Sequence, residues 1–154
     1  MKSLIISSSL SETSRSFILC KEIQELLEKK GVDTTFVDAR ELELLPYHKG
    51  MSPSMQKLSK QAEEADNIIF GMGVHCYSVN DGLKIILDNC CNKVEGKFFG
   101  VACAAGGEKS YLSTMHLTQI CMNEWRMIQL PRIVYATGKD FTDDKVSNPD
   151  VKER

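Results

Sequence analysis

A run of hydroxyl-bearing residues near the start of the chain has the composition of an anion-binding loop. Seven of the ten residues at positions 7–16 are serine or threonine, and Arg15 adds a charged donor suited to phosphate. The run follows the apolar residues Leu4-Ile5-Ile6 and leads into a helical pattern. At a helix N-terminus, free backbone N–H groups and the helix dipole favour an anion. A solvated loop, with Ser14 as an ordinary helix cap, is the alternative that these residues alone leave open.

Two later segments have the composition of ligand-binding loops. Residues 73–82 carry apolar and aromatic side chains between glycines, which suits stacking against a planar ring. Residues 104–110 are small at their start, so a ligand could approach the main chain closely.

His75 suggests a general base, but no nucleophile or partner carboxylate is evident. A histidine that makes a loop hydrogen bond is therefore the favoured interpretation.

Short apolar runs alternate with amphipathic segments about five times along the chain, which predicts a parallel sheet covered on both faces. Right-handed crossovers leave few topologies, of which we favour the flavodoxin-like three-layer sandwich with strand order 2-1-3-4-5. Ligands of such sheets bind beyond the carboxyl ends of the strands, where the three segments above would meet. Pro131 lacks an N–H and favours an edge position for the last strand. The expected strands are 3–8, 35–38, 67–72, 98–104 and 127–135, and the expected helices are 17–27, one capped by Ser52-Pro53, one capped by Asp81 and one over 111–120.

Composition excludes several classes of protein. The 154 residues fit one domain, 42% of them are apolar, and the formal net charge of −2 disfavours nucleic acid as a partner. We expect no membrane association, since no apolar run could span a bilayer and no signal peptide is present. The six cysteines form no CxxC pair, so we expect reduced thiols in the cytoplasm and no metal site. Cys20, Cys103 and Cys121 lie in apolar stretches and are expected in the core.

The three segments together resemble the NADPH-dependent FMN reductase family. The first motif of that family runs Gly-Ser-Leu-Arg-x-Gly-Ser, and residues 8–14 follow its register as Ser-Ser-Leu-Ser-Glu-Thr-Ser. Its second motif has Pro-Glu-Tyr-Asn, then Pro-Gly, then Leu-Lys-x-x-x-Asp; here Val-His-Cys-Tyr at 74–77 precedes Asp81-Gly82 and residues 83–88, Leu-Lys-Ile-Ile-Leu-Asp. Its third motif, Val-Ser-x-Ser-Gly-Gly, corresponds to residues 102–107. The resemblance covers nearly the whole chain in order and spacing.

The resemblance implies an oxidoreductase that binds FMN, takes hydride from NADPH or NADH and passes electrons to a small acceptor such as a flavin or quinone. The flavin carries this chemistry, so no catalytic side chain is implied. The resemblance also implies a homodimer or homotetramer. By position, the FMN phosphate would be held by Ser9, Ser11, Ser14, Arg15 and Ser16, and the ring would be lined by Val74, His75, Cys76, Tyr77, Ser78 and Val79 and closed by Ala105, Gly106 and Gly107.

The chain departs from the family pattern at several positions. Ser8 and Thr13 stand where the motif has glycine, Ser11 stands where it has arginine, and the second motif is largely changed. Near the C-terminus, Asn148-Pro149 is a helix-start signal, but the chain ends at Arg154, whereas the family has a full last helix. We therefore expect a single domain with a short or missing final helix.

Other enzymes with an anion loop do not fit. A low-molecular-weight phosphatase needs a cysteine in that loop, and a receiver domain needs an aspartate where Met72 stands. A non-enzymatic electron carrier or redox sensor remains an alternative to the oxidoreductase. Carriers of this fold tend to be strongly acidic, so the mild charge favours the enzyme. Thiols at Cys76 and Cys103 would suit a sensor, although packing in the core is the favoured interpretation of both.

Overall fold

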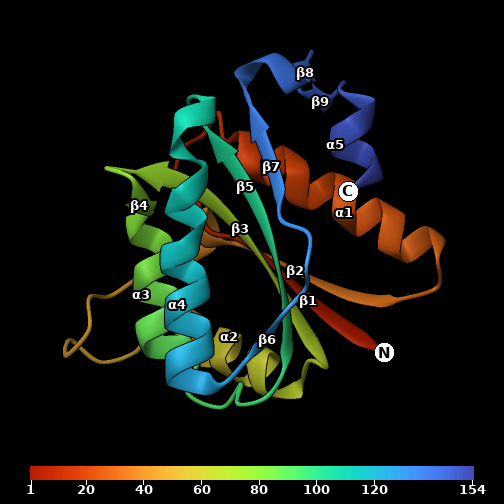
Figure 1. Ribbon diagram of the computed structural model, residues 1–154. Helices are drawn as coiled ribbons and strands as arrows, with labels where there is room; N and C mark the ends of the chain where they lie inside the picture. Colours follow the sequence, from red (N-terminus) through yellow and green to blue (C-terminus); the bar gives the residue numbers. More distant parts are fainter.

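A parallel sheet with strand order β2-β1-β3-β5-β6 forms the centre of the protein, and β7 also pairs with β5. Figure 1 shows the computed structural model, which describes residues 1–154. The order equals the predicted 2-1-3-4-5, with β6 and β7 sharing the fifth position. The strands of this sheet are β1 (Lys2–Ser7), β2 (Asp33–Asp38), β3 (Asn67–His75), β4 (Ser78–Val79), β5 (Phe98–Ala105), β6 (Ile128–Gln129) and β7 (Val134–Thr137).

Helices cover both faces of the sheet, as predicted for a three-layer sandwich (Figure 1). One side carries α1 (Arg15–Lys29) and α5 (Pro149–Glu153), and the other carries α2 (Pro53–Glu64), α3 (Asp81–Cys90) and α4 (Thr114–Trp125). Each side has its own apolar core, of 25 buried residues under α2–α4 and five under α1 and α5. Three 3-10 helices, η1 (Ala39–Glu41), η2 (Glu108–Ser113) and η3 (Gly138–Asp140), and a hairpin of β8 (Phe141–Thr142) and β9 (Lys145–Val146) complete the chain.

The three central strands run parallel and in register, so their carboxyl ends meet at one edge. Ser7 of β1 lies opposite Gly71 of β3, and Gly71 lies opposite Ala102 of β5. The side chains of Leu4, Ile5 and Ile6 are fully buried because β1 is covered on both faces. This register places the loops after β1, β3 and β5 side by side.

Helix starts follow local hydrogen bonding. The Ser14 hydroxyl accepts from the Phe17 N–H at 3.1 Å and starts α1. Ser52 caps α2 in the same way, with Pro53 in its first turn. The predicted cap of α3 at Asp81 is wrong, because Asn80 holds the extended N-cap backbone and Asp81 lies inside the first turn. Asparagine and aspartate are equally good caps, so the sequence does not distinguish these neighbours.

The prediction of one continuous strand over 127–135 is wrong. The Leu130 N–H still donates to the Phe99 carbonyl at 2.8 Å, but Pro131 has no N–H and the ladder stops there. Pairing with β5 resumes at Val134, so two short strands occupy one edge. The edge position predicted from Pro131 is confirmed.

A hairpin at the end of β3 was not predicted. The strand extends to His75, turns through Cys76 and Tyr77, and returns as β4. Both turn residues have left-handed backbones, with φ of 48° and 58°. Such a turn usually contains glycine or asparagine, so this one carries no sequence signal.

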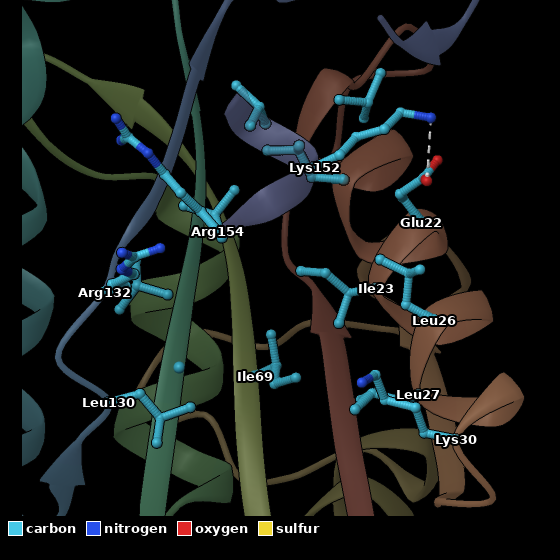
Figure 2. Close-up of a pocket in the computed structure, with 16 residues that line it drawn as sticks. Glu22, Ile23, Leu26, Leu27, Lys30, Ile69, Leu130, Arg132, Lys152 and Arg154 are labelled. Carbon is cyan, nitrogen blue, oxygen red and sulfur yellow. Dashed lines mark ion pairs between the residues drawn. The ribbon is translucent and has the colours of Figure 1, made fainter. Parts of the chain in front are cut away.

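The last helix begins at the predicted Asn148-Pro149 signal and is five residues long. Beside it, an apolar groove of about 230 Å³ runs between α1 and the middle of the sheet. Figure 2 shows Ile23 and Leu26 of α1 facing Ile69 and Leu130 across the groove, with the Lys152–Glu22 ion pair at its rim. The groove lies along the strands rather than at their carboxyl ends. No helix of the protein is long and apolar enough to cross a membrane.

The close approach of α1 to β3 gives a test of the fold. A Cβ atom at Gly71 would lie 2.2 Å from the Cys20 sulfur and 3.1 Å from the Ile6 carbonyl oxygen. Gly71→Ala should therefore lower the free energy of unfolding by about 1–3 kcal/mol, measured by urea denaturation. Gly100→Ala is the matched control, since its Cβ would meet the Leu130 side chain at an ordinary 3.4 Å. Equal effects of the two substitutions would contradict this account of the packing.

Candidate functional site

The loop after β1, residues 8–14 (loop 1), presents hydrogen-bond donors without protein acceptors. The backbone N–H groups of Glu12, Thr13 and Ser14 donate to no protein group, and the first turn of α1 adds the free N–H groups of a helix start. The hydroxyls of Ser14 and Ser16 lie 3.0 Å apart at the same place. Such a cluster of donors at a helix N-terminus suits a phosphate.

Two arginines flank loop 1. Arg15 is exposed in the first turn of α1, and its guanidinium lies against Gly138 after β7, where a Cβ would be 3.2 Å from Nη1. Arg40 pairs with the buried Asp38 at 2.5 Å and donates to the Glu12 carbonyl at 3.3 Å. From η1, just after β2, Arg40 thus supports loop 1 through the Glu12 carbonyl. The Arg15 guanidinium forms no ion pair with a protein carboxylate.

The loops after β3 and β5 border an open cavity of about 660 Å³. Its walls are Val74, Cys76 and Tyr77 from the β3–β4 hairpin (loop 2, residues 73–80) and residues 106–110 (loop 3). A Cβ atom added at Gly73, Gly106 or Gly107 would meet nothing within 4 Å, so the main chain is open there. An open main chain beside apolar and aromatic side chains fits a flat ring system such as that of a flavin.

Tyr135 of β7 holds loop 3 through a hydrogen bond and a ring contact. Its hydroxyl donates to the Gly107 carbonyl at 2.6 Å, and its ring meets that of Tyr111 edge-on at 5.2 Å. Burial raises the pKa of the Tyr135 hydroxyl, which therefore stays a donor at neutral pH. At the outer end of loop 3, Glu108 forms an ion pair with Lys139. Loop 3 is thus held from the end of β7.

The structure brings together part of the predicted set. Val74, Cys76, Tyr77, Gly106 and Gly107 line the cavity. The others do not line it. His75, Ser78 and Val79 belong to the hairpin beside it, and Ala105 is buried in β5 opposite Thr137. Of the predicted phosphate residues, Ser9, Ser11 and Ser14 lie in loop 1, and Arg15 and Ser16 lie in the first turn of α1.

His75 does have a neighbouring carboxylate, contrary to expectation. Its Nδ1 lies 3.7 Å from an Asp81 oxygen, and both side chains are exposed. A second histidine, His116 of α4, lies 3.0 Å from the Ser78 hydroxyl and ties β4 to α4. His75 thus contacts the start of α3, and His116 contacts β4 through the Ser78 hydroxyl.

All six cysteines are free thiols. Cys20, Cys103 and Cys121 are buried as predicted, and burial raises the pKa of each to about 12, so they stay protonated at neutral pH. Cys76 is exposed in the hairpin turn, so its expected packing in the core is wrong. No three His, Cys, Asp or Glu side chains are grouped to hold a metal ion.

Two residues outside the predicted set hold loop 1 against loop 2. Asn80 is buried and hydrogen-bonds to Ser8 and Gly73, and Gly82 packs against the Ser8 carbonyl. The sequence singled out Gly82 only through its place in the family motif, and it did not identify Asn80, because an asparagine before a helix is usually taken only as a cap.

A family model described as NADPH-dependent FMN reductase matches residues 1–142. No curated protein sequence matches the chain significantly. Similar solved structures include an NADH:FMN oxidoreductase, at 15% identity and TM-score 0.82, covering 99% of this chain and 82% of that one.

Two further structures share the fold. A flavoenzyme NAD(P)H:(acceptor) oxidoreductase from Paracoccus denitrificans has 16% identity and TM-score 0.75, covering 99% of this chain and 89% of the other. A flavodoxin from the domain Archaea has 16% identity and TM-score 0.70, covering 99% and 92%. At these identities the likeness shows the fold alone, which is the predicted flavodoxin-like one.

Proposed function

Because this chain belongs to the NADPH-dependent FMN reductase family, we propose that it passes electrons from a nicotinamide through FMN to a small acceptor such as a flavin or quinone. The family confirms the predicted class, a flavin-dependent NAD(P)H oxidoreductase with FMN as cofactor and a nicotinamide as co-substrate. When bound, the flavin supplies the hydride and electron chemistry, and the protein supplies binding and orientation. The observation that carries the proposal is the open main chain of loops 2 and 3 around one cavity, beside the donors of loop 1.

Each loop has its own role in this proposal. Loop 1 and the first turn of α1 hold the phosphate through Ser9, Ser11, Ser14, Arg15 and Ser16. The hairpin residues 74–79 lie along the ring, and residues 105–107 close its other side. The Tyr135 hydroxyl keeps the Gly107 carbonyl turned toward β7, which leaves the neighbouring main chain free for the ring.

The nicotinamide reaction provides the direct test. Protein loaded with FMN should show the yellow spectrum of an oxidised flavin and bleach within seconds when NADPH or NADH is added without oxygen. A bound flavin that stays oxidised with both nucleotides would leave the carrier or sensor as the function. A protein that takes up no FMN would overturn the cofactor site itself.

The phosphate site can be tested with two substitutions. Ser14→Ala combined with Arg15→Ala should weaken FMN binding by about 2–4 kcal/mol, because two hydrogen bonds to a charged phosphate are lost. Fluorescence titration with FMN measures the change. Arg126→Asn is the control, since it removes an exposed arginine after α4 and asparagine tolerates its left-handed backbone. Unchanged affinity in the double variant would show that the phosphate lies elsewhere.

We infer a homodimer or homotetramer from an exposed apolar stripe beside the cavity. Leu112, Met115 and Met122 are 74%, 51% and 50% exposed, and their spacing puts them on one side of η2 and α4. By contrast Met55, Met72 and Met127 fill the core.

Light scattering after gel filtration tests this assembly. Met115→Lys combined with Met122→Lys should convert the oligomer to monomers, because two charges cannot be buried unpaired in an apolar contact. Leu26→Lys, on the opposite layer of helices, is the control. A wild-type protein that is monomeric at high concentration would contradict the inference.

The six free thiols also support a reducing compartment, for which we propose the cytoplasm.

A further inference from the structure

Asn80 is a buried asparagine whose side chain joins two loops far apart in the sequence. Its amide nitrogen donates to the Ser8 carbonyl at 2.8 Å. Its carbonyl oxygen accepts from the Gly73 N–H at 3.1 Å and lies 3.0 Å from the Ser8 hydroxyl. The residue is 1% exposed, so water does not replace these bonds. One carboxamide therefore bonds to the first residue of loop 1 and the first residue of loop 2.

The helix that follows Asn80 does not use its side chain. Asn80 occupies the N-cap position of α3 but makes no capping hydrogen bond there. Its donor and acceptor are both directed across the carboxyl edge of the sheet. A residue kept only to start the helix would instead accept from the first turn, as Ser14 and Ser52 do.

Ser8 is in close contact with both Gly71 and Gly82. The Ser8 N–H and hydroxyl lie 3.1 Å and 2.6 Å from the Gly71 carbonyl, and a Cβ at Gly82 would lie 2.5 Å from the Ser8 carbonyl. Ser8 is the position at which the family motif has glycine, so the hydroxyl in this contact is a feature of this chain. Loops 1 and 2 therefore meet at one small, fully bonded point.

We propose that Asn80 is a positioning residue that sets loop 1 and loop 2 in one fixed relation, so that the phosphate and the ring of FMN are held at the correct spacing. This inference rests on the proposed function, which places the phosphate on loop 1 and the ring on loop 2. Asn80 touches neither group itself. It acts through the Ser8 carbonyl, which leads into loop 1, and through the Gly73 amide, which leads into loop 2.

The test compares Asn80→Ala with Asn89→Ala. Asn89 is also a buried asparagine of the α3 region, but its amide donates within the helix, to the Ile85 carbonyl at 2.8 Å. Asn80→Ala should weaken FMN binding at least about tenfold, since the Ser8 carbonyl and the Gly73 N–H each lose their buried side-chain partner, whereas the Ser8 hydroxyl keeps the Gly71 carbonyl. It should also alter the visible circular dichroism of the remaining bound flavin. Asn89→Ala should change neither, even where it lowers stability equally.

Asn80→Asp provides a readout that a structural role alone would not give. A protonated aspartic acid can donate to the Ser8 carbonyl as the asparagine does, whereas the carboxylate places a negative oxygen against it. FMN affinity of this variant, relative to wild type and Asn80→Ala at each pH, should therefore rise as pH falls from 8 to about 5. His75 and Asp81 remain in all three proteins, so their titration cancels. A flat ratio across this range would overturn the proposal.

Hydrogen exchange of the protein without FMN separates this proposal from the proposed function. Asn80→Ala should speed exchange in both loop 1 and loop 2, and Asn89→Ala in neither. Faster exchange in both loops together with a wild type that binds no FMN would refute the flavin site while leaving the coupling of the loops intact. Normal FMN binding by Asn80→Ala would refute the positioning role while leaving the flavin site intact.

Discussion

The in-register pairing of β1, β3 and β5 fixes where every part of the site begins, because these strands are buried on both faces and a slip of one residue would turn their apolar side chains over. The row from Ser7 through Gly71 to Ala102 is the last common level of the three strands. Beyond this row the three loops follow separate paths. Packing is tight at the row itself, since Gly71 has no space for a side chain against α1.

Positive charge reaches loop 1 from elements on either side of it. Within the loop, Ser11 stands at the position of the arginine in the family motif. Arg15 comes from the start of α1, and Arg40 comes from η1, where it pairs with Asp38 at the end of β2. Arg40 is neutralised by its carboxylate partner and acts on the loop through the Glu12 carbonyl, so Arg15 is the charge left for an anion.

Much of the fold could be predicted because apolar runs and helix starts are local signals. The Ser52 cap and the burial of Cys20, Cys103 and Cys121 followed from such signals, and the strand order followed from the alternation of strands and helices with the crossover rule. The Ser14 cap was the alternative that the loop residues left open. The split of the edge strand could not be predicted. Whether the N–H that Pro131 lacks would interrupt pairing depends on the position of β5, which the sequence does not give. Loops 2 and 3 could be located from composition and family order.

The backbone geometry and the contacts of these loops could be predicted less well. The turn at Cys76 and Tyr77 adopts left-handed backbones that neither residue favours, so its geometry depends on the strands around it. Asn80 contacts Ser8 across 72 positions of sequence, and no single sequence reveals such a contact. The carboxylate beside His75 was missed for a similar reason, because the hairpin and the helix start come together only in the folded chain.

The interruption at Pro131 has a consequence for how the protein behaves in crowded solution. The outer side of the sheet at this edge carries exposed apolar side chains, Phe98, Ile128 and Leu130, which would favour pairing with a strand of another molecule. Two strands of two and four residues, separated by a proline, offer no long row of free N–H and C=O groups to such a strand. Pro131 therefore disfavours aggregation by strand pairing at this exposed apolar edge.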